Sequence, residues 1–154
     1  MQNMVSLLAN YCPVFAESDL IAPIVFPFVC LFGNDEYFCF EVLYKLLRHW
    51  LSFLFSDFPL ANTRLLQNIY EILEIEDMPL LMHLKEIKAP FTKLVWGILS
   101  NFFTTTFNRE IFLSIVDNLF ANYEDPSLII FILLGYLSYQ RSTLLTMRSE
   151  KDLD

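Results

Sequence analysis

Glycine is scarce in this chain: its 154 residues include three Gly and seven Pro, beside sixteen Phe. All-β domains need many tight turns, and disordered chains are poor in apolar residues, so a chain that is 55% hydrophobic fits neither class. Its length suits one domain around a single core. Long helices joined by short loops are therefore expected.

Long uninterrupted apolar runs are also missing. A membrane-spanning helix needs about 18 or more apolar residues in succession. The run 20–32 has thirteen residues and contains two prolines, and the run 127–140 has fourteen. Asn3, Asn10 and Pro13 interrupt the apolar residues near the N-terminus, and no basic residue precedes them, which is untypical of a signal peptide. We expect no transmembrane segment and a cytoplasmic protein.

The residues that usually carry catalysis or bind metals are few and scattered. The cysteines Cys12, Cys30 and Cys39 lack Cys-x-x-Cys spacing and lie in apolar surroundings, where a thiol acts as a small hydrophobic group. The chain has no Gly-rich phosphate loop, no Gly-x-Ser-x-Gly and no His-Glu-x-x-His. The motifs therefore predict no catalytic residue, no metal site and no cofactor.

Positive charge is too sparse for a polyanionic partner. Eighteen acidic and ten basic residues give a net charge of −8, so neither nucleic acid nor an anionic membrane surface is expected to bind. One acidic run consists of Glu71, Glu74, Glu76 and Asp77. It could face a basic partner, although a solvated helix end is the commoner explanation.

The spacing of apolar residues predicts an all-α fold, a compact bundle of about seven helices. The expected helices are residues 17–32, 37–55, 62–74, 77–84, 91–103, 108–120 and 127–139. Expected N-caps are Asn34 or Asp35, Asp77, Asn108 and Asp125. The last helix is apolar nearly all round, which predicts a central position. The expected domain is residues 1–141, followed by a polar tail at 142–154.

Two separated stretches carry a family resemblance. In WGILSNFFTTTFNREIFLSIVDNLF, from Trp96 to Phe120, a Trp-led helix ends in an aromatic pair and a second helix ends in Val-Asp-x-Leu-Phe. The stretch YCPVFAESDLIAPIVFPF begins at Tyr11 and continues through Leu20 and Pro23. Together they resemble the later half of the TBC domain, the helical module of GTPase-activating proteins for Rab-type small GTPases. The first stretch corresponds to the late helices of that domain, and the second corresponds to its Tyr-x-Gln and Leu-x-x-Pro motifs.

The resemblance extends from about Tyr11 to Arg141, and the run Val-Phe-Pro-Phe-Val at 25–29 is similar to that of the WD-repeat-containing branch found at centriolar satellites. It implies that the chain is part of a TBC domain. It further implies that the apolar run 17–32 is a core helix that its prolines kink or split.

The same resemblance argues against catalysis. TBC proteins are understood to insert an Arg finger, from Ile-x-x-Asp-x-x-Arg, and the Gln of Tyr-x-Gln at the bound nucleotide. An Arg finger can raise GTP hydrolysis by about 10³ to 10⁵. Here Pro13 stands in the place of the Gln, and none of the ten residues before Tyr11 is Arg.

Two functions stay open on this basis. The preferred one is a catalytically degenerate TBC-like scaffold that binds proteins at the centriole or cilium, with a Rab-type small GTPase among the candidate partners. The alternative is an active Rab GTPase-activating protein whose Arg finger lies outside this chain. An unrelated helical bundle is the remaining explanation.

The partner-binding candidates surround the lost Gln position. They are Tyr11, Pro13, Phe15, Glu17 and Asp19. Loop packing and helix capping would explain the same residues without a partner. Arg48 and Arg109 are the first arginines to substitute in a search for an unrecognised finger.

Overall fold

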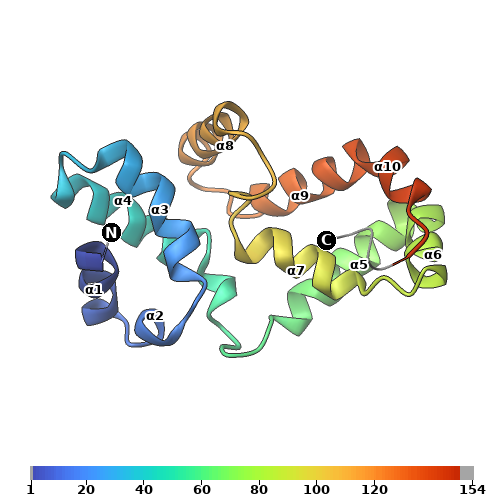
Figure 1. The fold of residues 1–154 in the computed structure, drawn as a ribbon, viewed down its shortest axis with the longest axis horizontal. Helices are drawn as coiled ribbons and strands as arrows, with labels where there is room; N and C mark the ends of the chain where they lie inside the picture. Colours follow the sequence, from blue (N-terminus) through green and yellow to red (C-terminus); the bar gives the residue numbers. More distant parts are fainter. Residues whose placement is uncertain (1, 150–154) are drawn as a thin grey trace.

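The computed structural model describes residues 2–149, and within that range every regular element is a helix (Figure 1). The helices are α1 (Gln2–Tyr11), α2 (Val14–Glu17), α3 (Ile21–Phe32), α4 (Glu36–His49), η1 (Ser52–Leu54), α5 (Thr63–Glu76), α6 (Met78–Glu86), α7 (Phe91–Ser100), α8 (Arg109–Ala121), α9 (Leu128–Tyr139) and α10 (Arg141–Thr146). The predicted all-α class is confirmed.

The helices form two groups that share one apolar core (Figure 1). In the first group α1 contacts α2, α3 and α4, and α3 contacts α4. In the second group α7 contacts α5 and α9, and α6 contacts α5 and α10. Helix α8 stands between the groups, with Phe112 against Phe28 of α3 at a ring-centroid distance of 6.2 Å.

Each of the seven predicted helices has a counterpart, and three more were not predicted. Helices α2 and α10, with four and six residues, are too short to establish a period, whereas α1 has ten residues and buries Met4 and Leu8, whose helical spacing was missed. The predicted tail from residue 142 is wrong in its first part, because residues 142–146 continue α10, which packs on α6 and buries Leu144. Residues 150–154 of that tail lie outside the described residues.

Two predicted helices end early. The helix expected to reach residue 55 ends at His49 and continues as η1. The helix expected to reach residue 103 ends at Ser100, because Phe102 and Phe103 have positive φ angles of 47° and 60°. A left-handed residue costs about 1–2 kcal/mol. Burial of each ring offsets that cost, since burying a Phe side chain stabilises by about 1.5–3 kcal/mol and both rings are 0% exposed.

Most of the apolar run 17–32 is one core helix, and its prolines do not split it, contrary to one of the two expected outcomes: α3 runs unbroken from Ile21 to Phe32 through Pro23 and Pro27. A break at residues 18–20 separates α2 from α3, and α3 then buries Ile21, Ile24, Val25 and Phe28. Pro27 lies inside α3, where it lacks the N–H that would bond back along the helix. The run therefore belongs to the protein core, as predicted.

Side-chain caps begin four of the helices. Oδ1 atoms of Asp35, Asn62, Asp77 and Asn108 accept hydrogen bonds from backbone N–H groups three residues later, at 2.8–3.1 Å. The prediction that Asp125 caps α9 is wrong. It accepts a bond from the Ser127 N–H in a turn, and the helix begins at Leu128.

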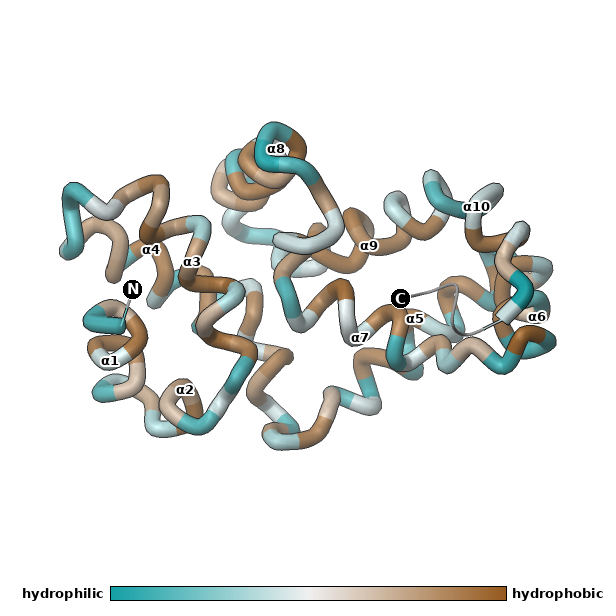
Figure 2. The backbone as a smooth tube through the Cα atoms, in the orientation of Figure 1, coloured by the Kyte–Doolittle hydropathy of each residue, from teal (hydrophilic) through white to brown (hydrophobic). Residues whose placement is uncertain are grey.

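Helix α9 is less central than its composition predicts. It is mostly hydrophobic in Figure 2, and it buries Ile129, Leu133 and Leu137. Phe131 nevertheless remains 63% exposed. The apolar character of this helix is therefore only partly explained by the core of residues 2–149.

Candidate partner-binding site

The segment that contains Pro13, which the resemblance aligns with the Gln of Tyr-x-Gln, is a tight turn between α1 and α2. Tyr11 is the last residue of α1, and Pro13 precedes the first residue of α2 with φ −55° and ψ −30°. This backbone is helical, so the proline ring fits it without strain. Pro13 is exposed, and it offers a partner neither an N–H nor a polar side chain.

Tyr11 lies on an aromatic surface of α4. Its side chain is 66% exposed, and its ring centroid lies 5.1 Å from that of Phe40 and 5.6 Å from that of Tyr44. Phe40 and Tyr44 stack on each other at 5.9 Å. These contacts position the Tyr11 ring on α4 while most of its surface stays open to a partner.

An arginine completes this surface. Arg48 Nη1 donates a hydrogen bond to Tyr44 Oη at 2.5 Å, and the guanidinium lies 5.8 Å from the Tyr44 ring centroid. Tyr11, Tyr44 and Arg48 line a hollow of about 340 Å³, here named the Tyr11 pocket. Its other lining residues are Cys12, Phe15, Leu47, Ser52, Phe55 and Ser56.

The structure brings only part of the predicted set together. Phe15 is buried and packs edge-on against Phe55 at 4.9 Å, so it forms a wall of the Tyr11 pocket rather than a free surface. Glu17 and Asp19 are exposed and line a separate hollow of about 320 Å³ with Trp96. Partner binding by these five residues stays a prediction: Tyr11 and Phe15 line one pocket, Glu17 and Asp19 line another, and the exposed Pro13 lines neither.

The most distinctive polar group of the site was not among the predicted partner-binding residues. Arg48 was singled out only as a possible finger, and Tyr44 was not singled out. The spacing of four residues, which puts Tyr44 and Arg48 on one face of α4, could have indicated that they meet. A link between α4 and the turn after α1 could not be read from spacing.

The Tyr11 pocket is suited to docking a protein. Its lining combines aromatic rings, hydroxyl groups and one guanidinium, and contains no carboxylate and no histidine. Within residues 2–149, no three His, Cys, Asp or Glu side chains gather as a metal site would require. In the same described range, the helices are too short or too polar for any of them to cross a bilayer.

Comparison with known proteins agrees with this architecture. TBC1 domain family member 31 from mouse is 29% identical over all 154 residues, and the alignment covers 15% of the mouse protein. The protein of that name from Homo sapiens is 29% identical and the one from Xenopus laevis 30%, each with 14% of its length covered. The chain thus spans about one seventh of the length of these relatives. No solved structure matches it.

The family comparison covers nearly the whole chain. The Rab-GTPase-TBC domain family matches residues 2–145, a range that runs from the start of α1 into α10. This is the family that the Trp96–Phe120 and Tyr11–Phe28 stretches resemble. The chain belongs to the Rab-GTPase-TBC domain family.

Proposed function

We propose that this chain is a catalytically degenerate TBC module that binds a protein partner through the Tyr11 pocket. The observation that carries the proposal is Pro13, which follows Tyr11 and Cys12 where the family has the Gln of Tyr-x-Gln. A proline side chain can neither orient an attacking water nor donate to a phosphate oxygen. The module keeps its helices and its exposed surface without this group.

The composition of the Tyr11 pocket supports a docking role. Tyr and Arg are enriched among the residues that dominate protein interfaces, because they bury a large area and still form hydrogen bonds. Tyr11 offers an exposed ring, and Arg48 offers a guanidinium that Tyr44 holds in place. A Rab-type small GTPase is the first partner to test, since the chain belongs to a Rab-GTPase-TBC family.

Single-turnover GTP hydrolysis tests the catalytic part of the proposal. A panel of Rab-type GTPases loaded with GTP is measured with and without an excess of the chain, after its cooperative unfolding has been verified. We expect no acceleration. An acceleration of about a hundredfold or more would overturn the proposal and favour an active Rab GTPase-activating protein. Arg48→Ala and Arg109→Ala would then locate the finger.

Binding by the same panel tests the docking part. Any GTPase that binds the chain should bind Tyr11→Ala and Arg48→Ala at least about tenfold more weakly, as expected for central aromatic and Arg contacts. Tyr139→Ala is the matched control, because Tyr139 is 82% exposed and lies at the end of α9. Equal losses in all three variants would contradict binding at the Tyr11 pocket.

A cellular location at the centriole or cilium is proposed from the resemblance of residues 25–29 to the centriolar-satellite branch. A fluorescently tagged chain should be enriched at satellites relative to the free tag. Uniform distribution of a folded chain would argue against this location without affecting the binding proposal.

A further inference from the structure

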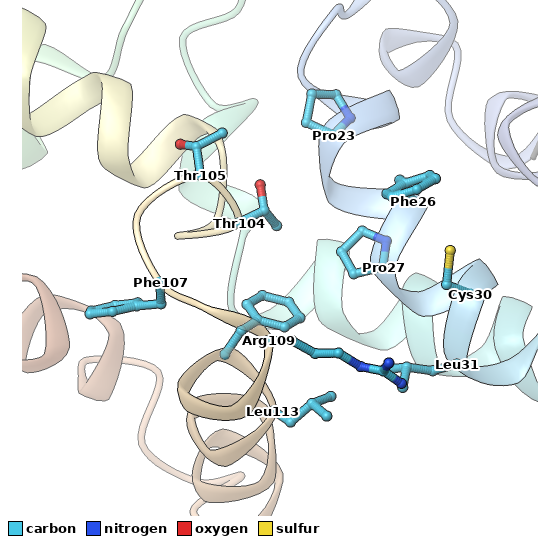
Figure 3. A pocket seen from close by; sticks show the side chains of 11 residues that line it. Pro23, Phe26, Pro27, Cys30, Leu31, Thr104, Thr105, Phe107, Arg109 and Leu113 are labelled. Carbon is cyan, nitrogen blue, oxygen red and sulfur yellow. The ribbon is translucent and has the colours of Figure 1, made fainter. Parts of the chain in front are cut away.

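A third hollow lies apart from the Tyr11 pocket, between α3 and the start of α8 (Figure 3). Its volume is about 630 Å³, and we name it the α3–α8 groove. One wall consists of Pro23, Phe26 and Pro27 on α3, and the opposite wall includes Phe107 and Leu113. The groove shares no lining residue with the Tyr11 pocket.

The α3 wall exposes apolar surface that its own helices leave uncovered. Helix α3 contains no charged residue, and the ring of Phe26 is 58% exposed at the groove. Cys30, one helical turn later, is also exposed. Exposed apolar surface gathered in a hollow is typical of a binding site for another apolar group.

Arg109 is the only charged side chain among the lining residues. It is the first residue of α8, and its side chain extends across the groove toward Leu31 of α3 (Figure 3). Within the described range 2–149, no residue accepts a hydrogen bond from this guanidinium, and none forms an ion pair with it. Its planar set of donors matches a carboxylate, which it can bind through two parallel hydrogen bonds.

We propose that the α3–α8 groove binds a short segment of a partner protein, with a large apolar side chain between α3 and α8 and one neighbouring carboxylate on Arg109. Charge complementarity selects a single acidic group, because the groove has one cation. Polyanions are disfavoured by the net charge of −8. The open rim at Phe26 and Cys30 suits a peptide better than a small ligand, since small-ligand sites enclose most of their ligand. The proposal concerns a second site and does not depend on the function of the Tyr11 pocket.

Selection from a random peptide library on phage tests this proposal. The library is selected on the folded chain, with counter-selection on Arg109→Gln and Phe26→Ser. Both side chains are exposed, so the variants are expected to fold, and thermal unfolding checks this. The enriched peptides should share one Asp or Glu beside a large apolar residue. Failure to enrich any peptide over the variants, or enrichment of peptides without an acid, would overturn the proposal.

Affinities of a synthetic peptide from that selection separate charge from packing. Arg109→Gln should weaken binding by about tenfold or more, and replacing the acid of the peptide by its amide should have a similar effect. The two changes together should cost little more than either alone. Arg109→Lys should retain part of the affinity. Independent, additive losses would overturn the assigned Arg109–carboxylate contact.

Two cysteines then report the place of binding. Cys30 lines the α3–α8 groove and Cys12 lines the Tyr11 pocket, so alkylation by iodoacetamide distinguishes the two hollows in one experiment. Cys39 is buried. The bound peptide should slow the alkylation of Cys30 at least severalfold relative to that of Cys12. Protection that does not favour Cys30 would overturn the assignment of the groove.

Discussion

Asp77 and Arg141, 64 residues apart in the sequence, form a side-chain ion pair with two hydrogen bonds. Arg141 donates from Nε to Oδ2 at 2.5 Å and from Nη2 to Oδ1 at 3.2 Å. Asp77 also caps α6, since its Oδ1 accepts from the Leu80 N–H at 3.1 Å. One carboxylate thus joins the α5–α6 junction to the first residue of α10.

Replacement of Asp77 by Asn should reveal the contribution of this pair to stability. The hydrogen bonds from Arg141 are the main cause that lowers the pKa of the Asp77 carboxyl below its usual 3.8. A carboxyl group whose pKa is lower in the folded state than in the unfolded state stabilises the fold at pH values above the unfolded-state pKa. This stabilisation is lost as the pH falls through the folded-state pKa. Asp77→Asn should therefore be less stable than the wild type at pH 7, with the difference closing below about pH 4. Urea unfolding at several pH values measures it.

Asn is a suitable replacement because it caps helices about as well as Asp, so the variant removes the charge and retains the cap. Asp57→Asn is the control, an exposed acid outside this pair. A difference between Asp77→Asn and the wild type that persists unchanged at low pH would contradict an electrostatic origin.

Helix α9 should respond very differently on its two faces. Leu133 is 0% exposed, and truncation to Ala is expected to cost about 2–5 kcal/mol of unfolding free energy. Phe131 is 63% exposed, and Phe131→Ala should change stability by only about 0.5 kcal/mol. Chemical denaturation of both variants tests the packing, and a large loss in Phe131→Ala would mean that this face is covered in solution.

Much of the fold followed from apolar spacing alone. The pattern Ile111, Phe112, Ile115, Val116 placed α8 within one or two residues, because one side of a helix must be apolar to meet the core. Helix α2 escaped detection, since four residues are little more than one turn. The early end of α7 also could not be predicted. It depends on the burial of Phe102 against Phe28 and Phe112, residues far away in the sequence.

The candidate site was harder to predict than the fold. Tyr11 and Phe15 meet in one pocket because the end of α1 packs on α4 while Phe15 of α2 packs on Phe55, a tertiary relation that local spacing does not contain. Glu17 and Asp19 follow closely in sequence but line another hollow. Arg48 belongs to the site because α4 presents it beside Tyr44. Closeness in sequence therefore does not show where one pocket ends and the next begins in this domain.

Trp50 offers a test of a buried polar group. Its side chain is 1% exposed, its ring packs edge-on against Phe120 and Tyr123 at 5.2 Å, and its Nε1 has no hydrogen-bond partner in the described part of the chain. Trp50→Phe removes that N–H and keeps most of the packing, so it should cost less than about 1.5 kcal/mol. Trp50→Ala should cost about 3–5 kcal/mol because it leaves a cavity.

Thermal and urea unfolding compare the two variants. Equal destabilisation by Trp50→Phe and Trp50→Ala would contradict an unpaired indole N–H. It would indicate a hydrogen bond that residues 2–149 do not show in the structure.

Pro13→Gln tests the proposed absence of catalysis at the one position where the family's Gln is replaced by proline. Gln fits the helical backbone of Pro13, whose φ is −55°. Replacing proline gives the unfolded chain more conformational freedom, which should lower the free energy of unfolding by no more than about 1 kcal/mol. The family role of this Gln is to place water, whereas the Arg finger neutralises charge and supplies the larger effect. The 154-residue variant should therefore leave single-turnover GTP hydrolysis by Rab-type GTPases at its intrinsic rate.

Pro13→Ala controls for the backbone change. Acceleration in Pro13→Gln alone would imply that an arginine of this chain already reaches the nucleotide. Arg48, which lines the same pocket as Tyr11, would be the first to replace in that background.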